Sequence, residues 1–359
     1  MSVREFGERP LIQRIRRSIG RRSSRVSVGI GDDAAVLTTS PGQCLLATTD
    51  LLIEEVHFRR RSASPYEIGW KAMAVNLSDI AAMGGVPRYA LIALALPPEL
   101  SVEEVDDLYR GMTALAARHD VELVGGDTCT SPHGLVLSLT LLGEASAPVL
   151  RSGARPGDLL AVTGSLGLSA AGLALLETSP RELLPDDREL ALAAHRRPTP
   201  RTREGQWLQG RGVAHAMIDL SDGLATDAGH IATESGVSVT VRVDRLPISP
   251  AVRRIAEATG RDPVTLAVTG GEDYELLLTL APDSSPELSR HFLNETGTPL
   301  TMIGEVTAGD PTVKFVDAHG QVVTFGEGFD HFSSSRSRSG LPTSYSGPRA
   351  PNPEPRSLS

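Results

Sequence analysis

The first half of the chain contains segments with helical periodicity that alternate with apolar runs of strand length. Residues 66–83 place apolar side chains at helical spacing and predict a helix that ends at a glycine pair, and residues 102–118 predict a second helix. Residues 89–96 form a continuous apolar run, which is typical of a strand buried on both faces. Residues 45–49 predict a strand that ends at Asp50, and strand ends often hold metal ligands rigidly.

The second half of the chain begins after the turn-rich residues 151–158, which precede a predicted strand over residues 159–163. A boundary there gives an N-terminal domain of residues 1–150 and a C-terminal domain of residues 151–332, both of ordinary domain size. Both halves mix strands and helices without strict β-α-β repetition, which predicts the α+β class. The other predicted elements are strands on both sides of Gly125-Gly-Asp127, strands over 135–142, 237–243 and 275–280, and a helix over 252–258.

The composition, 40% hydrophobic and 22% charged, is that of a soluble globular protein. The chain has no run of about 18 apolar residues and no secretion signal at its N-terminus, so we expect a cytoplasmic protein without a membrane segment. The net charge is −9, although residues 333–359 contain four Arg and one Glu. This Ser/Pro/Arg-rich tail is expected to be disordered. The acidic remainder argues against nucleic-acid binding.

Lysine and cysteine are rare in this chain, and their positions limit the kinds of nucleotide, disulfide and metal site that it can form. Lys71 and Lys314 are the only lysines, and neither follows the Gly-x-x-x-x-Gly pattern of a P-loop, so that kind of nucleotide site is excluded. Phosphates must then be bound by metal ions, arginines or backbone amides. Cys44 and Cys129 are too few for a disulfide framework and lack zinc-site spacing, and we expect both to be inert core thiols.

Acidic residues recur beside glycines or small polar residues in five places. They are Gly29-Ile-Gly-Asp-Asp33, Thr48-Thr-Asp50, Asn76-Leu-Ser-Asp79, Gly125-Gly-Asp127 and Asp219-Leu-Ser-Asp-Gly223. Carboxylate, hydroxyl and carbonyl oxygens are the ligands that Mg²⁺ prefers. Five such segments, distributed over both halves, predict a site that holds several Mg²⁺ ions against phosphate groups.

Two of these segments have a local alternative, because one of Asp32 and Asp33 could cap a helix, and Asp222 could equally be a helix N-cap or a metal ligand. Asp33 is the stronger metal candidate of the Asp32–Asp33 pair. Gly270-Gly-Glu-Asp-Tyr-Glu275 repeats the pattern of glycines before acids and predicts a substrate-contacting loop. No Ser/His/Asp or Cys/His constellation is needed if the acceptor is itself a phosphate, because its oxygen is already anionic.

The motifs together resemble one family. The five acidic segments, Val56-His-Phe58, Lys71 to Gly85, Arg151 to Asp158, Gly270 to Glu275 and Gly328-Phe-Asp-His-Phe332 are similar to thiamine-monophosphate kinases, in order from about residue 5 to residue 332. The resemblance implies the two-domain fold of aminoimidazole ribonucleotide synthetase and a homodimer that pairs through the N-terminal domains. It also implies ATP-dependent phosphorylation of thiamine monophosphate to thiamine diphosphate by direct transfer, with several Mg²⁺ ions.

The resemblance also assigns roles to individual residues. Metal ligands would be Asp33, Thr48, Thr49, Asp50, Asp79, Asp127, Asp219 and Asp222. ATP would be contacted by Gly126, Asp127, Arg151 and Ser221, and thiamine monophosphate by His57, Glu272 and Phe329. Two positions depart from the family pattern: Glu55 replaces the usual glycine before Val-His-Phe, and Phe329 offers a stacking face without a hydroxyl group.

Two other functions stay open. One is a related ATP-using enzyme that acts on another phosphorylated acceptor, although the hydrogenase-maturation and selenophosphate enzymes use a terminal reactive cysteine that this chain lacks. The other is a non-catalytic paralogue that binds nucleotide and metal. The retained acidic residues argue against it, because a scaffold has no need of mutually repelling carboxylates.

Overall fold

The computed structural model describes residues 2–6, 11, 14–15, 17–19, 25–28, 36–180, 182–283, 286–326 and 328. Residues 2–328 of this set belong to one compact unit that contains two large sheets, one from each half of the chain. The predicted tail at residues 333–359 lies outside the described residues. No helix among the described residues is long and apolar enough to cross a membrane.

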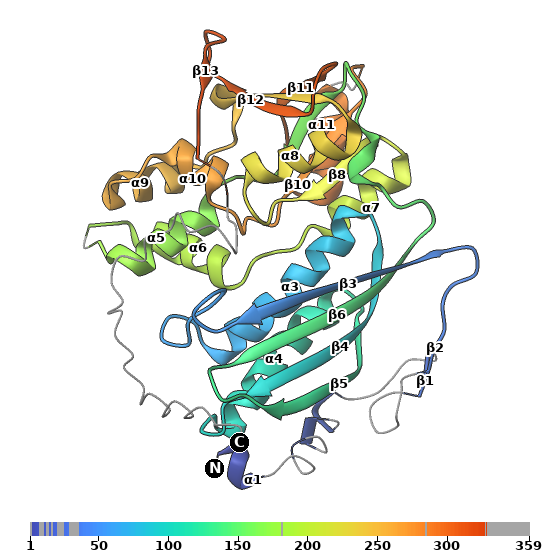
Figure 1. Cartoon of the computed structure of the whole chain (residues 1–359), viewed down its shortest axis with the longest axis vertical. Helices are drawn as coiled ribbons and strands as arrows, with labels where there is room; N and C mark the ends of the chain where they lie inside the picture. Colours follow the sequence, from blue (N-terminus) through green and yellow to red (C-terminus); the bar gives the residue numbers. More distant parts are fainter. Residues whose placement is uncertain are drawn as a thin grey trace, which may run out of the picture. The chain divides into compact units, whose positions relative to one another are not determined.

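The first half of the chain builds a four-stranded sheet in the order β3-β6-β4-β5. Its elements are β3 (Cys44–Ile53), α3 (Pro65–Ala82), β4 (Val86–Leu96), α4 (Val102–Arg118), β5 (Glu122–Thr130) and β6 (Val136–Ala145). Helices α3 and α4 lie behind this sheet in Figure 1, and its other face is turned toward the viewer. Near the N-terminus, α1 (Val3–Phe6) precedes a small antiparallel pair of strands, β1 (Val26–Val28) and β2 (Val36–Leu37).

Local sequence explains where the two large helices begin. Ser64 and Ser101 each accept a hydrogen bond from the backbone of the residue three positions on, and the glutamates at those positions bond back. These two capping boxes satisfy amides that would otherwise lack partners. The helices then cross closely at Gly69 and Gly111, because a Cβ atom at either position would lie 2.0 Å from a backbone oxygen of the other helix.

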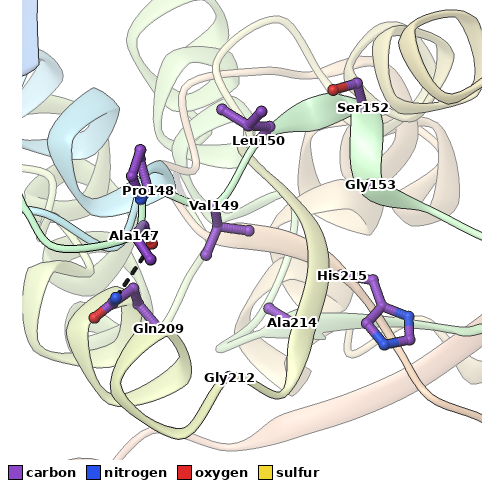
Figure 2. A pocket seen from close by; sticks show the side chains of 10 residues that line it. All are labelled: Ala147, Pro148, Val149, Leu150, Ser152, Gly153, Gln209, Gly212, Ala214 and His215. Atoms are coloured by element: carbon purple, nitrogen blue, oxygen red, sulfur yellow. Dashed lines mark hydrogen bonds between the residues drawn. The ribbon is translucent and has the colours of Figure 1, made fainter. Parts of the chain in front are cut away.

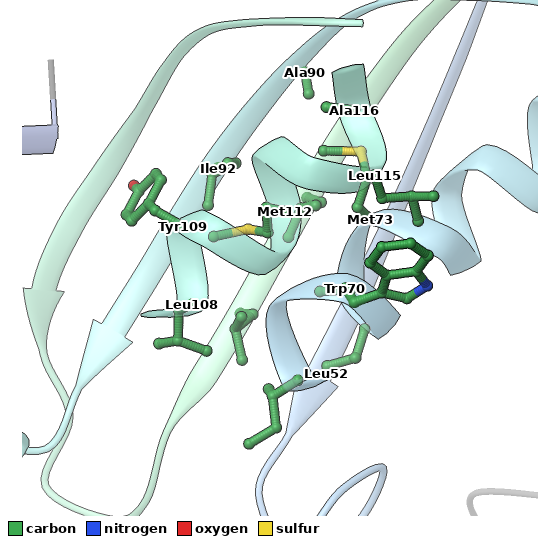
Figure 3. Close-up of a cluster of buried hydrophobic side chains, with 14 of the residues drawn as sticks. Leu52, Trp70, Met73, Ala90, Ile92, Leu108, Tyr109, Met112, Leu115 and Ala116 are labelled. Atoms are coloured by element: carbon green, nitrogen blue, oxygen red, sulfur yellow. The ribbon is translucent and has the colours of Figure 1, made fainter. Parts of the chain in front are cut away.

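The core of the first half lies between the sheet and the two helices. Met73, Leu108 and Met112 are fully buried there and face Ile92 of the central strand β4 (Figure 3). The opposite face of the sheet is partly covered, where Val26 packs on Tyr89 and neighbouring side chains. Helix α3 is buried along nearly its whole length, and such burial favours polar side chains that find partners inside the protein.

The second half builds a seven-stranded mixed sheet in the order β13-β12-β9-β11-β7-β10-β8. Its strands are β7 (Leu159–Thr163), β8 (Ala214–Asp219), β9 (Ser238–Arg242), β10 (Leu276–Leu280), β11 (Leu300–Thr307), β12 (Thr312–Val316) and β13 (Val322–Val323). Its helices are α5 (Leu168–Thr178), α6 (Pro185–Arg196), α7 (Thr202–Arg211), α8 (Leu224–Ser235), α9 (Pro250–Thr259), α10 (Pro263–Thr269) and α11 (Pro286–Thr296). Two short 3-10 turns, Arg151–Gly153 and Val243–Arg245, complete the described elements.

Most predicted elements are confirmed, and three predictions are wrong. The strand predicted to end at Asp50 continues to Ile53, and Gly125-Gly-Asp127 lies inside β5 rather than between two strands. Both cases have one reason: backbone pairing with neighbouring strands extends β3 and β5 through residues of low strand propensity. Cys44 and Cys129 are exposed rather than buried, since β3 and β5 form the two edges of the sheet.

Candidate active site

Three carboxylates from different elements meet where the two halves of the chain join. Asp50 comes from β3, Asp79 from the last turn of α3, and Asp219 from the end of β8. Thr48 donates a hydrogen bond from Oγ1 to Asp79 Oδ2. Ser78 Oγ donates to Asp219 Oδ2 at 2.7 Å and so connects α3 directly to the second sheet. Helix α3 thus places two successive side chains, those of Ser78 and Asp79, toward the other carboxylates.

Burial and mutual repulsion disfavour negative charge in this acidic cluster, which we define as Asp50, Asp79 and Asp219. Burial, followed by the charge of Asp79, raises the pKa of Asp50 to about 7. The same two causes raise the pKa of Asp219 to about 7, and burial raises the pKa of Asp79 as well. Carboxyl groups that repel one another in a poorly solvated site are stabilised as anions by a nearby cation.

One cation of the chain itself already acts on this cluster. Arg151 begins the 3-10 turn that links the two halves, and its charge lowers the pKa of both Asp79 and Asp219. These effects are smaller than those of burial. The predicted ATP residue Arg151 therefore lies beside the predicted metal residues Asp79 and Asp219, with its guanidinium group available to bind phosphate oxygens.

The sheet separates the remaining predicted ligands of the first half. Asp50 pairs with Leu139, whereas Asp127 belongs to the row formed by Leu51, Ser138 and Ala93. Neighbouring rows of a sheet project to opposite faces, so the exposed Asp127 points away from the helices that cover Asp50. Thr49 lies on the same open face, where its hydroxyl donates to Leu139 O at 2.9 Å.

The edge strand β5 also lies far across the sheet from Asp50. Two strands, β6 and β4, intervene, and at normal strand spacing the separation is about 14 Å. Position 126 in β5 must be glycine because the neighbouring strand β4 lies too close for a side chain: a Cβ atom there would lie 1.8 Å from Ile92 O. Within one chain, Gly126 and Asp127 are therefore not part of the acidic cluster.

A second acidic group follows β8. Asp227 accepts hydrogen bonds on Oδ2 from the backbone amides of Asp222 and Gly223, at 3.2 and 3.1 Å. Gly223 and not Asp222 is the N-cap residue of α8, so the alternative that Asp222 is the helix N-cap is wrong. Carboxylate oxygens of Asp222 and Asp227 and a ring nitrogen of His230 lie within 4.8 Å of one another, close enough to ligate one ion. Burial raises the pKa of Asp227 to about 8.

The loop before β10 returns to the same region. The Glu272 amide donates to Ser221 O at 2.8 Å, and the Tyr274 amide donates to Leu220 O at 2.9 Å. Glu272 and Tyr274 have φ angles of 59° and 50°, a conformation that side chains other than glycine rarely adopt. Such strain persists where surrounding contacts hold the backbone, and it is frequent at functional sites.

Glu272 is held by two side chains that sequence reasoning did not assign to the site. Lys71 Nζ lies 2.6 Å from Glu272 Oε1, and His195 Nδ1 lies 3.2 Å from Glu272 Oε2. Burial favours the neutral acid, but the charge of Lys71 and the hydrogen bond from His195 hold the pKa of Glu272 at about 2. Lys71 Nζ also donates to the backbone oxygen of His57 at 3.2 Å, so two of the three predicted acceptor-binding residues, Glu272 and His57, contact one lysine.

Tyr274 belongs to the Gly270–Glu275 motif, but no role was assigned to it from the sequence. It belongs to the loop of the second half but is buried in the core cluster of the first half. Burial and the nearby charges of Glu272 and Asp50 raise the pKa of its phenol well above its usual value. The phenol is therefore close enough to Glu272 and to the acidic cluster to sense their charges, and only tertiary packing brings it into the core of the first half.

The glycine-rich turn before α5 has a structural role. Asp273 accepts hydrogen bonds from the amides of Gly167 and Ser169, at 2.6 and 3.2 Å. Its carboxylate therefore occupies the position at the start of α5 that a phosphate takes in many nucleotide sites. Burial raises the pKa of this acid to about 7.

Two predicted residues, Asp33 and Phe329, lie outside the described residues, as does Asp32. The family departure at Glu55 lies within them. Its φ angle is 65°, which explains the glycine usual at this position, since glycine adopts that conformation without steric cost. The Glu55 carboxylate pairs with Arg61 at 2.9 Å and with Arg59 at 3.4 Å, so its charge is balanced on the surface.

A separate cavity of about 340 Å³ lies along the link between the two halves (Figure 2). Its lining consists of Ala147, Pro148, Val149, Leu150, Ser152, Gly153, Gln209, Gly212, Ala214 and His215. No carboxylate lines it, and His215 is instead paired with Asp158 at 2.9 Å. This cavity adjoins the Arg151 turn but does not include the acidic cluster.

Comparison with known proteins decides the family. The family described as AIR synthase related protein, N-terminal domain, matches residues 31–145, and its C-terminal domain counterpart matches residues 155–316. A thiamine-monophosphate kinase from Salmonella typhimurium is 41% identical over 320 residues, which cover 87% of this chain and 95% of the relative. The chain belongs to the thiamine-monophosphate kinase family.

Solved structures of this kinase family share the fold. A thiamine-monophosphate kinase from Stenotrophomonas maltophilia K279a is 40% identical, with a TM-score of 0.76 over 87% of this chain and 96% of that one. AaThiL in complex with AMPPCP and TMP is 37% identical, with a TM-score of 0.73 over 92% of this chain and 99% of that one. The two-domain α+β fold expected from the motifs is therefore confirmed.

Proposed function

We propose that this member of the thiamine-monophosphate kinase family transfers the γ-phosphoryl group of ATP to thiamine monophosphate and forms thiamine diphosphate. The observation that carries the proposal is the acidic cluster of half-buried Asp50 and Asp79 and buried Asp219, which both halves build beside Arg151. AaThiL, a relative over nearly its whole length, was solved with AMPPCP and TMP together, a nucleotide and a phosphorylated acceptor in one complex.

The donor set of the cluster suits Mg²⁺. Asp50, Asp79 and Asp219, with the hydroxyl of Thr48, are hard oxygen donors, and their raised pKa values mark a place where a divalent cation stabilises the ionised form. We assign Asp222 to the same set, and we retain Asp33, Thr49 and Asp127 as further ligands of bound nucleotide-metal complexes. Bound Mg²⁺ would neutralise charge on the phosphates and so reduce repulsion between donor and acceptor.

The other residues bind and orient the two substrates. Arg151, whose charge acts on the cluster, and Ser221, which follows the end of β8, would contact the phosphates of ATP together with Gly126 and Asp127. His57, Glu272 and Phe329 would contact thiamine monophosphate. The acceptor oxygen is already an anion near neutral pH, so orientation and charge neutralisation suffice and no residue is assigned as general base.

We further propose a homodimer in the cytoplasm, where ATP is available. The support is the open face of the four-stranded sheet, which carries Leu51 at 50% exposure beside Ala93 and Ser138. Asp127 lies on this face, away from the cluster of its own chain. Pairing of two such faces would bury Leu51 and place each Asp127 at the contact between subunits.

The deciding experiment incubates the purified protein with Mg-ATP and thiamine monophosphate and measures thiamine diphosphate. We expect turnover, and we expect Asp50→Asn to reduce it by about 100-fold or more, because a metal ligand is lost. The matched control is Asp310→Asn, the same change at an exposed acid of the second half, which should keep the wild-type rate.

Two outcomes favour the alternatives. ATP turnover with only a different phosphorylated acceptor would reject the substrate and retain the site. Nucleotide binding without turnover on any phosphorylated acceptor would favour a non-catalytic paralogue. Wild-type activity in Asp50→Asn would reject the cluster as the metal site.

A further inference from the structure

Lys71 is a buried cation at the junction of several segments. Its side chain is 5% exposed, and it lies on α3 among the packed residues of the first-half core. A buried ammonium group is unfavourable unless hydrogen-bond acceptors or an anion replace its water. The described contacts supply two replacements: Glu272 Oε1 at 2.6 Å, and the backbone oxygen of His57 at 3.2 Å.

His195 is the second side chain that contacts the Glu272 carboxylate. It lies on α6, its side chain is 12% exposed, and its Nδ1 is 3.2 Å from Glu272 Oε2. Each oxygen of the Glu272 carboxylate therefore has its own partner. Ser169 Oγ lies 3.2 Å from the same ring nitrogen and limits the orientation of the imidazole.

The backbone of Glu272 is held in place as well as its side chain. Its left-handed φ of 59° and the bond from its amide to Ser221 O hold the loop against the end of β8. The side chain nevertheless retains 27% exposure, and each carboxylate oxygen can accept a hydrogen bond in addition to the one from Lys71 or His195. A carboxylate that is held in one orientation on a partly exposed side chain is arranged to accept hydrogen bonds from a bound molecule.

We propose that Lys71 and His195 are positioning residues that determine how tightly the acceptor binds. Lys71 holds the Glu272 carboxylate and the His57 backbone in one arrangement, and His195 fixes the rotation of that carboxylate. This inference rests on the proposed function, because Glu272 and His57 are the residues assigned there to thiamine monophosphate.

The chemistry of the acceptor fits this arrangement. Thiamine monophosphate carries a cationic thiazolium ring, which bears the phosphorylated side chain, and an aminopyrimidine ring at the end remote from the phosphate. An ionised carboxylate can bind either the cation or the amino group. Lys71 and the His195 ring hold the Glu272 carboxylate in one orientation, and neither is among the residues assigned above to the phosphates of ATP. Loss of either residue should therefore weaken acceptor binding and leave ATP binding unchanged.

The test measures steady-state constants for both substrates with Lys71→Met and His195→Leu. We expect each substitution to raise KM for thiamine monophosphate by about tenfold or more and to change KM for ATP by less than about twofold. Lys71→Arg should recover part of the loss, because it keeps the positive charge. The matched control is Lys314→Met at the other lysine, an exposed position on β12, which should leave both constants unchanged.

A double substitution separates positioning from general loss of structure. Lys71→Met alone leaves Glu272 as a buried charge with one partner fewer, and this variant is at risk of misfolding. Lys71→Met combined with Glu272→Gln removes both charges and should fold. Because Lys71 acts mainly through Glu272, adding Lys71→Met to Glu272→Gln should raise the acceptor KM by less than about threefold.

The results that overturn the inference are distinct from those that overturn the proposed function. Equal changes in KM for ATP and for the acceptor, or full additivity in the double substitution, would show that Lys71 serves only the fold. No effect of either single substitution would reject the inference while the wild-type enzyme still forms thiamine diphosphate. Wild-type protein that does not phosphorylate thiamine monophosphate would overturn both.

Discussion

At the scale of single residues, the surroundings give the same functional group opposite properties. Glu272 stays ionised, with a pKa of about 2, because Lys71 and His195 oppose the effect of burial. Asp50 and Asp219 have pKa values near 7, because burial and neighbouring carboxylates act together. The first arrangement suits a fixed anion that accepts hydrogen bonds, and the second suits a site that binds cations.

The raised pKa of Asp219 predicts an unusual pH dependence for the metal-free protein. Between about pH 4 and pH 7 the folded state holds a proton on Asp219 that the unfolded state has lost, so its contribution to stability disappears as the pH rises through 7. Asp219→Asn imitates the protonated acid. In EDTA at pH 8 it should raise the free energy of unfolding by on the order of 2 kcal/mol over the wild type.

The measurement is urea denaturation of both proteins at pH 5 and pH 8. At pH 5 the difference should be clearly smaller than at pH 8, because the folded wild type is then protonated and only its unfolded state has lost the proton, and it should vanish below about pH 4. Added Mg²⁺ should stabilise the wild type at pH 8 and have little effect on Asp219→Asn. If the two proteins differ in free energy of unfolding by the same amount at pH 5 and pH 8, the raised pKa of Asp219 is contradicted.

At the scale of elements, helix α3 connects the fold to the site. One side packs on α4 through Gly69, its last two turns carry Ser78 and Asp79, and Lys71 reaches the acceptor loop. A shift of α3 would displace all of these groups together. The close crossing with α4 therefore stabilises the fold and also aligns the site.

A Gly69→Ala substitution tests this crossing. The added Cβ would lie 2.0 Å from Leu108 O, so the helices must separate, and the free energy of unfolding should fall by about 1–3 kcal/mol. The matched control is Gly229→Ala in α8, where nothing lies within 4 Å and alanine should stabilise by up to about 1 kcal/mol. Thermal or urea unfolding measures both. Equal responses of the two variants would show that the crossing is not tight.

At the scale of the whole molecule, the site is complete only because the two halves meet. The Ser78–Asp219 hydrogen bond and the Lys71–Glu272 ion pair both connect residues that are far apart in the chain. In the proposed homodimer, a second copy of the chain would pack on the open sheet face that carries Leu51 and Asp127.

The homodimer is tested by Leu51→Glu and light scattering after gel filtration. We expect the wild type to have the mass of a dimer and Leu51→Glu to shift toward the monomer, because a charge would be buried at the contact. Leu293→Glu places the same charge at a 44% exposed leucine on α11 and should remain dimeric. If Leu51→Glu remains a dimer, the interface must lie on a surface other than the open sheet face.

Local sequence was enough to locate α3, α4 and β7, because periodicity and the capping serines act within a few residues. The order of the motifs was likewise enough to indicate the family and the α+β fold. The ends of β3 and β5 were missed, because hydrogen bonds to neighbouring strands determine them.

The grouping of the acids depends on tertiary structure. Strand pairing places Asp50 and Asp127 on opposite faces of one sheet, although both stand in similar motifs. Lys71 and Tyr274 stand in motifs quoted from the sequence, but neither they nor His195 had an assigned role. They join the site because α3, α6 and the loop before β10 pack together. Spacing along the chain identifies which residues can bind metal and phosphate, but burial and long-range packing decide which of them share a site and what charge each carries.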